Sequence, residues 1–208
     1  METRKRFLDS TTQTVIALEV AEVLKGGGIC ILPTDTIYGI VALEQFALSI
    51  RRIFEIKKRP ASKPFIRLIG RPDALGQYTD QVLPGSIEKY WPGPLTLIFR
   101  ARVEGTVAVR FPDAPFLAEV FSHLGTSGIV APSANISGES DIYDCDLLTE
   151  TFEGFVDLIV CQRGGLRETK ASTILDITRE PWKVLRRGSL VIEEHDLNTE
   201  NHKKNRSQ

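Results

Sequence analysis

A short apolar segment near the N-terminus, Ile29–Leu32, most constrains the fold of this 208-residue chain. Three glycines precede the segment and Pro33 follows it, which is typical of a buried strand in an α/β sheet. Pro33 has no N–H to donate to a neighbouring strand, so it ends the ladder. The polar residues Thr34, Asp35 and Thr36 come next, at the carboxyl end of the predicted strand, where open α/β sheets usually bind ligands. An ordinary turn contains similar residues, so this loop alone does not establish a site.

Hydrophobic periodicity predicts the remaining elements. Apolar residues at helical spacing predict helices over residues 12–25, 47–56, 72–90 (in the main), 115–124 and 146–152. Short apolar runs predict further strands at 65–69, 95–101, 107–110, 129–131, 158–161, 172–177 and 184–186. This order indicates an α/β protein with a twisted, mixed parallel and antiparallel sheet flanked by helices. We expect a single domain over residues 1–192 and a disordered polar tail over 193–208, where the apolar periodicity stops.

Composition narrows the class of protein. The net charge is −1, with 42% hydrophobic and 25% charged residues, as in ordinary soluble proteins. No apolar run approaches the roughly 20 residues of a membrane span, and no secretory signal is evident. Cys30, Cys145 and Cys161 have no C-x-x-C spacing, which favours reduced thiols in a cytoplasmic protein over disulfides or zinc. The three histidines are scattered, so no metal site built from protein side chains is expected.

Basic residues gather in one part of the chain. Residues 51–71 contain a single acid, Glu55, and eight cations: Arg51, Arg52, Lys57, Lys58, Arg59, Lys63, Arg67 and Arg71. A solvated helix face is the plain interpretation of such a run. A phosphate site is favoured instead, because the cluster continues through a loop interrupted by proline and concentrates anions locally.

Pro60 gives the centre of this cluster a specific geometry. A residue before proline is pushed towards an extended conformation, and side chains alternate in an extended segment. Lys57 and Arg59 are therefore predicted to point the same way, with Lys58 pointing away. Arg59 offers a planar fork for phosphate oxygens, and Lys57 and Lys63 offer mobile point charges.

Five other positions are candidates of the same kind. After Pro132, alternation places Ser133 and Asn135 on one side of a loop, where they suit a ribose, a phosphate or a base edge. A local turn is an equally good interpretation of this pair. Arg110 ends a predicted strand and suits a carboxylate ligand or a surface ion pair. Ser172 opens one predicted strand and Arg186 closes another, and each is a weak signal alone.

Seven segments of the chain together resemble the motifs of the YrdC family, the threonylcarbamoyl-AMP synthases. They cover about residues 21–190. In chain order they are KGGGICILPTDTIYGIVAL, IRRIFEIKKRPASKPF, WPGPLTLIF, VAVRFP, APSANISG, STILDIT and VLRRGSL. The resemblance implies the YrdC-like α/β fold, in which a twisted sheet lines a basic concave groove.

The resemblance also implies an activity. Family members are nucleotidyltransferases that condense L-threonine, bicarbonate or CO2, and ATP into threonylcarbamoyl-adenylate and pyrophosphate. The product serves tRNA threonylcarbamoyladenosine synthesis, so tRNA is an expected partner, directly or through the downstream transferase complex. Mg²⁺ is expected to arrive with ATP. Positioning and charge stabilisation by Lys57 and Arg59 are expected to replace a dedicated catalytic side chain.

The family motifs assign two groups of residues. The L-threonine site is implied at Thr36, Arg67, Arg110 and Ser172. The ATP site is implied at Lys57, Arg59, Lys63, Ser133, Asn135 and Arg186.

Departures from the pattern qualify the resemblance. Many relatives have Asn-Pro at Lys63-Pro64, His at Arg67 and Pro at Arg187.

The chain is expected to be the short, single-domain form of the family. Two alternatives remain: a non-catalytic module that binds double-stranded RNA or tRNA, and a paralogue that uses another carbamoyl substrate.

Overall fold

The computed structural model of this chain describes residues 2–60, 63–125 and 128–197, whose strands form one ten-stranded sheet. Across the sheet the order is β1-β8-β2-β3-β7-β4-β6-β5-β9-β10. In chain order the strands are β1 (Arg4–Leu8), β2 (Cys30–Leu32), β3 (Gly39–Leu43), β4 (Arg67–Ile69), β5 (Leu95–Arg100), β6 (Thr106–Arg110), β7 (Gly128–Val130), β8 (Leu158–Gln162), β9 (Thr173–Asp176) and β10 (Lys183–Arg186).

The pairing of the strands is mixed, which confirms the predicted class. β8 runs parallel to β1 and β2, and β4–β6 and β5–β9 are also parallel pairs. The pairs β2–β3, β3–β7, β4–β7, β5–β6 and β9–β10 are antiparallel. The predicted opening strand is therefore β2, and the loop after Pro33 returns as its antiparallel neighbour β3, with Leu32 opposite Gly39.

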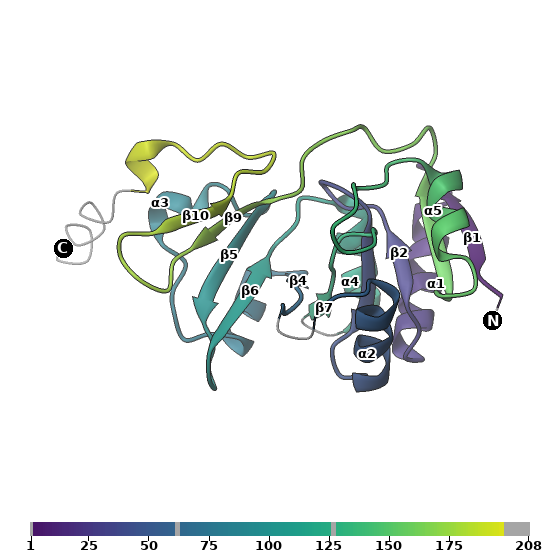
Figure 1. Cartoon of the computed structure of the whole chain (residues 1–208), viewed down its shortest axis with the longest axis horizontal. Helices are drawn as coiled ribbons and strands as arrows, with labels where there is room; N and C mark the ends of the chain where they lie inside the picture. The colour runs from purple at the N-terminus through teal and green to yellow at the C-terminus, as the bar shows by residue number, and fades with distance from the viewer. Residues whose placement is uncertain (1, 61–62, 126–127, 198–208) are drawn as a thin grey trace.

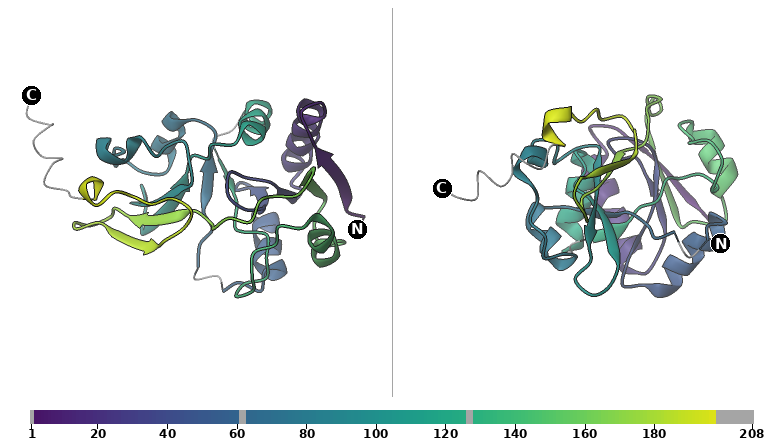
Figure 2. Two further views of the ribbon diagram at one scale, coloured as in Figure 1. Left: turned by 90° about the horizontal axis from the view of Figure 1, so that it is seen from above. Right: turned by 60° about the vertical axis from the view of Figure 1, so that its left-hand side comes forward.

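Helices cover both faces of one half of the sheet, as the view from above shows (Figure 2). α1 (Gln13–Lys25) and α4 (Pro115–Leu124) lie on one face, and α2 (Ala47–Ile56) and α5 (Cys145–Phe152) lie on the other. Each helix buries an apolar stripe; in α1 the buried residues include Ile16, Val20 and Leu24. Two separate apolar clusters result, one beneath each helix pair.

The other half of the sheet carries smaller elements (Figure 1). The 3-10 turn η1 (Pro72–Gln77) and the one-turn helix α3 (Gly85–Glu88) pack with β5, β6 and β9 around a third apolar cluster. The expectation of a mainly helical 72–90 segment is thus met only in part. No helix among the described residues is long and apolar enough to cross a bilayer.

Sequence analysis missed the first strand and misplaced the start of the tail. β1 carries three consecutive cations, Arg4, Lys5 and Arg6, yet it pairs with the buried strand β8 at the sheet edge. Residues 194–196 form the 3-10 turn η2 (Glu194–Asp196), and the Asp196 side chain is 6% exposed. It accepts a hydrogen bond from the Tyr90 hydroxyl at 2.7 Å, so the ordered chain continues past residue 192. Residues 198–208 lie outside the described residues.

The expectation of three reduced thiols is wrong for two of the cysteines. Cys145 begins α5 and Cys161 lies in β8, and their sulfurs form a disulfide with the Cα atoms 5.7 Å apart. A separation of 16 residues gives no signal in the sequence, whereas the packing of α5 on β8 brings the two Cα atoms within disulfide range. Cys30 is the free, buried cysteine.

Candidate functional site

A cavity of about 460 Å³ lies where the ends of several strands meet the loops after β2 and β7. Its walls include Ile66, which directly precedes β4, Leu68 of β4 and Ile174 of β9. Seven of the ten predicted site residues line it: Thr36, Arg59, Lys63, Arg110, Ser133, Ser172 and Arg186. No aspartate or glutamate lines it among the described residues, so the cavity attracts anions.

One wall joins the loop after β2 to the end of β6. Arg110 is the last residue of β6, and its guanidinium reaches back to this loop. Nη1 donates to the Thr36 hydroxyl at 3.1 Å, and Nη2 donates to the Thr34 hydroxyl at 3.2 Å and to Asp35 Oδ1 at 2.5 Å. Thr36 and Arg110 are 3% and 5% exposed, so this wall is preorganised.

Arg110 keeps unused hydrogen-bonding capacity. Its Nε is buried and has no partner within the described residues. Burial lowers the pKa of Arg110, and the neighbouring Asp35 carboxylate opposes that shift. An arginine remains cationic near neutral pH, so the group suits an anionic ligand such as a carboxylate.

The opposite wall is formed around Ser172. Its side chain is 1% exposed, and its hydroxyl shares a hydrogen bond with the Thr96 hydroxyl at 2.8 Å. Arg186, at the end of β10, donates from Nε to the Ser172 carbonyl at 2.9 Å and from Nη2 to its hydroxyl at 3.1 Å. Gly188 lies so close to Ala171 that any Cβ would clash with its backbone, and this close approach keeps Arg186 against the wall.

The prediction from Pro60 is confirmed for the side chains and wrong for the backbone: Lys57 and Arg59 line one hollow beside the cavity, and Lys58 lines a separate one. The chain is not extended here, because Lys57 ends α2 in a helical conformation and Lys58 is left-handed at φ 49°. The Lys57 ammonium is buried and donates to Ser133 O at 2.5 Å, Asn135 O at 2.5 Å and Asn135 Oδ1 at 3.0 Å. Three acceptors use its three N–H groups, so Lys57 shapes the loop after β7.

The predicted pairing of Ser133 and Asn135 on one side of this loop is confirmed. The Ser133 hydroxyl donates to Asn135 Oδ1 at 2.6 Å, and Asn135 Nδ2 donates to the Glu139 carbonyl at 2.7 Å. A hollow of about 160 Å³ beside the cavity is lined by Lys57 and Asn135 together with Arg59, Lys63 and Ser133. Burial lowers the pKa of Lys57 to about 8, with the Arg59 charge adding to that effect.

Arg59 and Lys63 are two further cations of the cavity; Arg59 is half-buried and Lys63 is exposed. Arg59 Nε donates to the Lys63 carbonyl at 2.9 Å, and its guanidinium lies 5.5 Å from the centre of the Phe65 ring. Neither side chain forms an ion pair with an acid in the described parts of the chain, so both charges remain available to a ligand. Arg59 is held in place by these contacts, as a phosphate-binding fork requires.

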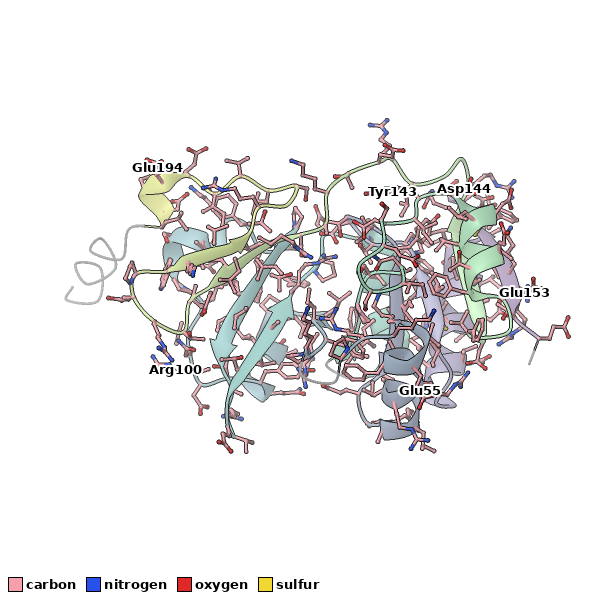
Figure 3. All side chains as sticks on the ribbon, in the orientation of Figure 1. Glu55, Arg100, Tyr143, Asp144, Glu153 and Glu194 are labelled. Atoms are coloured by element: carbon pink, nitrogen blue, oxygen red, sulfur yellow. A yellow bond between two sulfur atoms is a disulfide. The ribbon has the colours of Figure 1, made fainter. Side chains whose placement is uncertain are left out.

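A second hollow, of about 390 Å³, adjoins the 160 Å³ hollow at Ser133 and Asn135, which line both. It lies between the loop leading into α5, where Tyr143 and Asp144 are found (Figure 3), and the segment before Ser172. The Tyr143 hydroxyl donates to the Thr169 carbonyl and ties these two segments together. Sequence analysis missed Tyr143, because a single tyrosine in a polar loop carries no pattern.

Arg67 does not belong to this cavity. Side chains alternate along β4, so Leu68 faces the cavity and Arg67 faces away from it. Arg67 Nε donates to Glu44 Oε2 at 2.8 Å, and its guanidinium lies 5.7 Å from the centre of the Tyr78 ring. The predicted role of Arg67 in binding threonine is therefore dropped. Asp35, which pairs with Arg110, had been treated only as a loop residue.

The fold and the cavity define an α/β protein with a preorganised, cation-lined site at the ends of its strands. The model of the Sua5/YciO/YrdC family, described as "Telomere recombination", matches residues 22–188. The chain therefore belongs to this family, as its motifs had indicated.

Similar proteins agree with this assignment. The threonylcarbamoyl-AMP synthase of Pyrococcus abyssi is 35% identical over an alignment of 184 positions, which covers 82% of this chain and 53% of that protein. The Bacillus subtilis protein of the same name is 28% identical over an alignment of 212 positions, which covers 93% of this chain and 60% of the relative. The crystal structure of P. abyssi Sua5 complexed with L-threonine has a TM-score of 0.82 at 29% identity, covering 94% of this chain and 60% of that one. The chain thus spans little more than half the length of these relatives.

Proposed function

We propose that this chain is a threonylcarbamoyl-AMP synthase, which condenses L-threonine, bicarbonate or CO2, and ATP into threonylcarbamoyl-adenylate and pyrophosphate. One observation carries the proposal: a single cavity combines Thr36 and Arg110 with the unpaired cations Arg59 and Lys63. The names of the similar synthases and the threonine complex of P. abyssi Sua5 support the same substrates.

The reaction divides between two parts of the cavity. The threonine amine attacks CO2 and loses a proton, which gives a carbamate. A carbamate oxygen then attacks the α-phosphorus of ATP, and pyrophosphate leaves. Arg110 and Thr36, with Ser172 on the far wall, would hold the amino acid, while Arg59, Lys63, Ser133, Asn135 and Arg186 would hold the nucleotide. Holding both substrates in line and neutralising the phosphate charge supplies most of the catalysis.

Mg²⁺ would be supplied with ATP. Among the described residues no group of three His, Cys, Asp or Glu side chains is placed to hold a metal, whereas the cation-lined cavity suits phosphate oxygens. Magnesium bound mainly by phosphates and water fits such a site. The product would pass to a tRNA-modifying transferase, so contact with tRNA is direct or through that partner.

The first experiment measures pyrophosphate release by the purified chain with ATP, Mg²⁺, L-threonine and bicarbonate. Each component is omitted in turn, and L-serine replaces L-threonine in a further reaction. Release that requires all three substrates and falls with serine supports the proposal. ATP turnover that is indifferent to threonine contradicts it and favours another carbamoyl substrate.

A pair of variants tests the site itself. Arg59→Gln removes a cation that lines the cavity, and Lys58→Gln removes the adjacent cation, which lines a separate hollow with Arg52 and Phe155. The two variants change the net charge equally. We expect Arg59→Gln to raise the KM for ATP at least about tenfold, as the loss of a charge-assisted hydrogen bond predicts. Equal effects of the two variants would contradict the assignment.

A further inference from the structure

The four cations that line the cavity are not equivalent. Arg59, Lys63 and Arg186 form no ion pair with an acid within the described residues, whereas Arg110 forms one with Asp35. Both side chains of this pair are 6% exposed. The cavity therefore contains three cations with uncompensated charge and one, Arg110, whose charge is largely neutralised by the Asp35 carboxylate.

Asp35 is held firmly in its position. Its Oδ1 accepts from Arg110 Nη2 at 2.5 Å, and its Oδ2 accepts from the backbone N–H of Asp113 at 3.3 Å. Asp35 itself does not line the cavity. A ligand consequently meets the guanidinium of Arg110 and not the carboxylate, although it experiences the charge of both.

We propose that Asp35 is a positioning residue that makes Arg110 selective for a single carboxylate over a phosphate. The inference rests on the function proposed above, in which one cavity must sort an amino acid from a triphosphate. A dianionic phosphate entering beside this buried pair of zero net charge loses its hydration with only the charge of Arg186 nearby to replace it. An amino acid is itself close to neutral, so its carboxylate binds the guanidinium at much lower cost.

The unpaired cations complete the sorting. Arg59 and Lys63 are more exposed and uncompensated, so the multiply charged phosphates of ATP are drawn to that end of the cavity. The Thr34 and Thr36 hydroxyls, together with Asp35, hold the Arg110 guanidinium so that it does not swing towards the phosphates. Asp35 thus acts through Arg110: it favours the binding of the threonine carboxylate there and leaves the ATP phosphates to Arg59 and Lys63.

The test compares two isosteric changes of equal charge in the full chain. Asp35→Asn removes the counter-ion of Arg110 but keeps an oxygen that accepts its hydrogen bond. Asp113→Asn removes a neighbouring exposed charge and leaves the pair intact. Calorimetry then measures the binding of L-threonine and, separately, of ATP, each with and without inorganic phosphate as a competitor.

In the wild type and in Asp113→Asn, phosphate should weaken ATP binding and leave threonine binding unchanged. In Asp35→Asn, phosphate should compete with threonine, with an affinity at least about tenfold higher than in the wild type. An adjacent opposite charge shifts the affinity of a site for a proton by about ten- to a thousandfold, and an anion responds on a similar scale.

Four results would overturn the inference. Displacement of threonine from the wild type by phosphate refutes the inference. This result needs no variant, so it counts even if Asp35→Asn fails to fold. The selective role of Asp35 is refuted if phosphate leaves threonine binding to Asp35→Asn unchanged, or if phosphate competes equally with threonine in Asp113→Asn. The proposed function still stands in these two cases if the wild type releases pyrophosphate as expected. A wild type that binds no threonine refutes both proposals together.

Discussion

Replacing Lys57 with methionine tests whether this lysine shapes the loop after β7 or binds phosphate directly. Methionine preserves most of the side-chain length in a position that is 1% exposed, but it donates no hydrogen bond. Ser133 O still accepts from the backbone N–H of Asn135, and Asn135 Oδ1 still accepts from the Ser133 hydroxyl. Asn135 O loses the Lys57 ammonium, which is its donor in the structure.

The magnitude follows from this hydrogen-bond inventory. A hydrogen bond from a charged donor contributes about 1.5–3 kcal/mol, and a buried carbonyl without a donor costs about 1–3 kcal/mol. Because the variant no longer buries an ammonium, part of that loss is offset. We expect a net destabilisation of about 2 kcal/mol, which lowers the Tm of a chain this size by roughly 4–8 °C.

Thermal unfolding followed by circular dichroism measures this shift, with Lys58→Met as the matched control. Lys58 is exposed and outside the cavity, so its replacement should change the Tm by less than about 2 °C. If Lys57 were instead a direct phosphate ligand, Lys57→Met would raise the KM for ATP and leave the Tm unchanged. That outcome would refute our interpretation of the lysine.

Three further predictions follow from particular contacts. The pKa of Lys57 is about 8 in the folded chain against 10.5 in the unfolded one, so the unfolded chain holds the extra proton between these values. Stability against urea should therefore rise with pH across this window, and Lys57→Met should lack that rise. Cys161→Ala opens a disulfide of sequence separation 16 and should cost about 3 kcal/mol in urea unfolding; a reductant should destabilise the wild type similarly and leave the variant unchanged. Asp196→Ala removes the acceptor of the Tyr90 hydroxyl and should cost about 1.5–3 kcal/mol, whereas no loss would mean that η2 is dispensable.

Much of the fold was predictable because its signals are local. The apolar run before Pro33 became β2, and the helices predicted at 47–56 and 115–124 have the same bounds in the structure. Periodicity and proline geometry act over a few residues, so they are legible without knowledge of the neighbours. β1 was missed for the same reason: its cations carry no apolar signal, and it becomes a strand only because β8 offers an edge to pair with.

The residue types of the site were also evident in the sequence, since cations, hydroxyls and a carboxamide recur in motifs of known spacing. The sequence by itself thus determined the class of fold, the family and the chemistry that the cavity offers. The hydrogen-bonding and ion-pair partners of the site residues were not evident in the sequence. Arg110 is 75 residues from Asp35, and Lys57 is 78 residues from Asn135.

Tertiary structure decided which of these groups face the ligand. Alternation along β4 turned Arg67 away from the cavity, and the end of α2 buried the Lys57 ammonium beneath a distant loop. The disulfide likewise exists only because α5 packs on β8. These outcomes depend on strand register and packing between remote segments, which a local pattern does not encode.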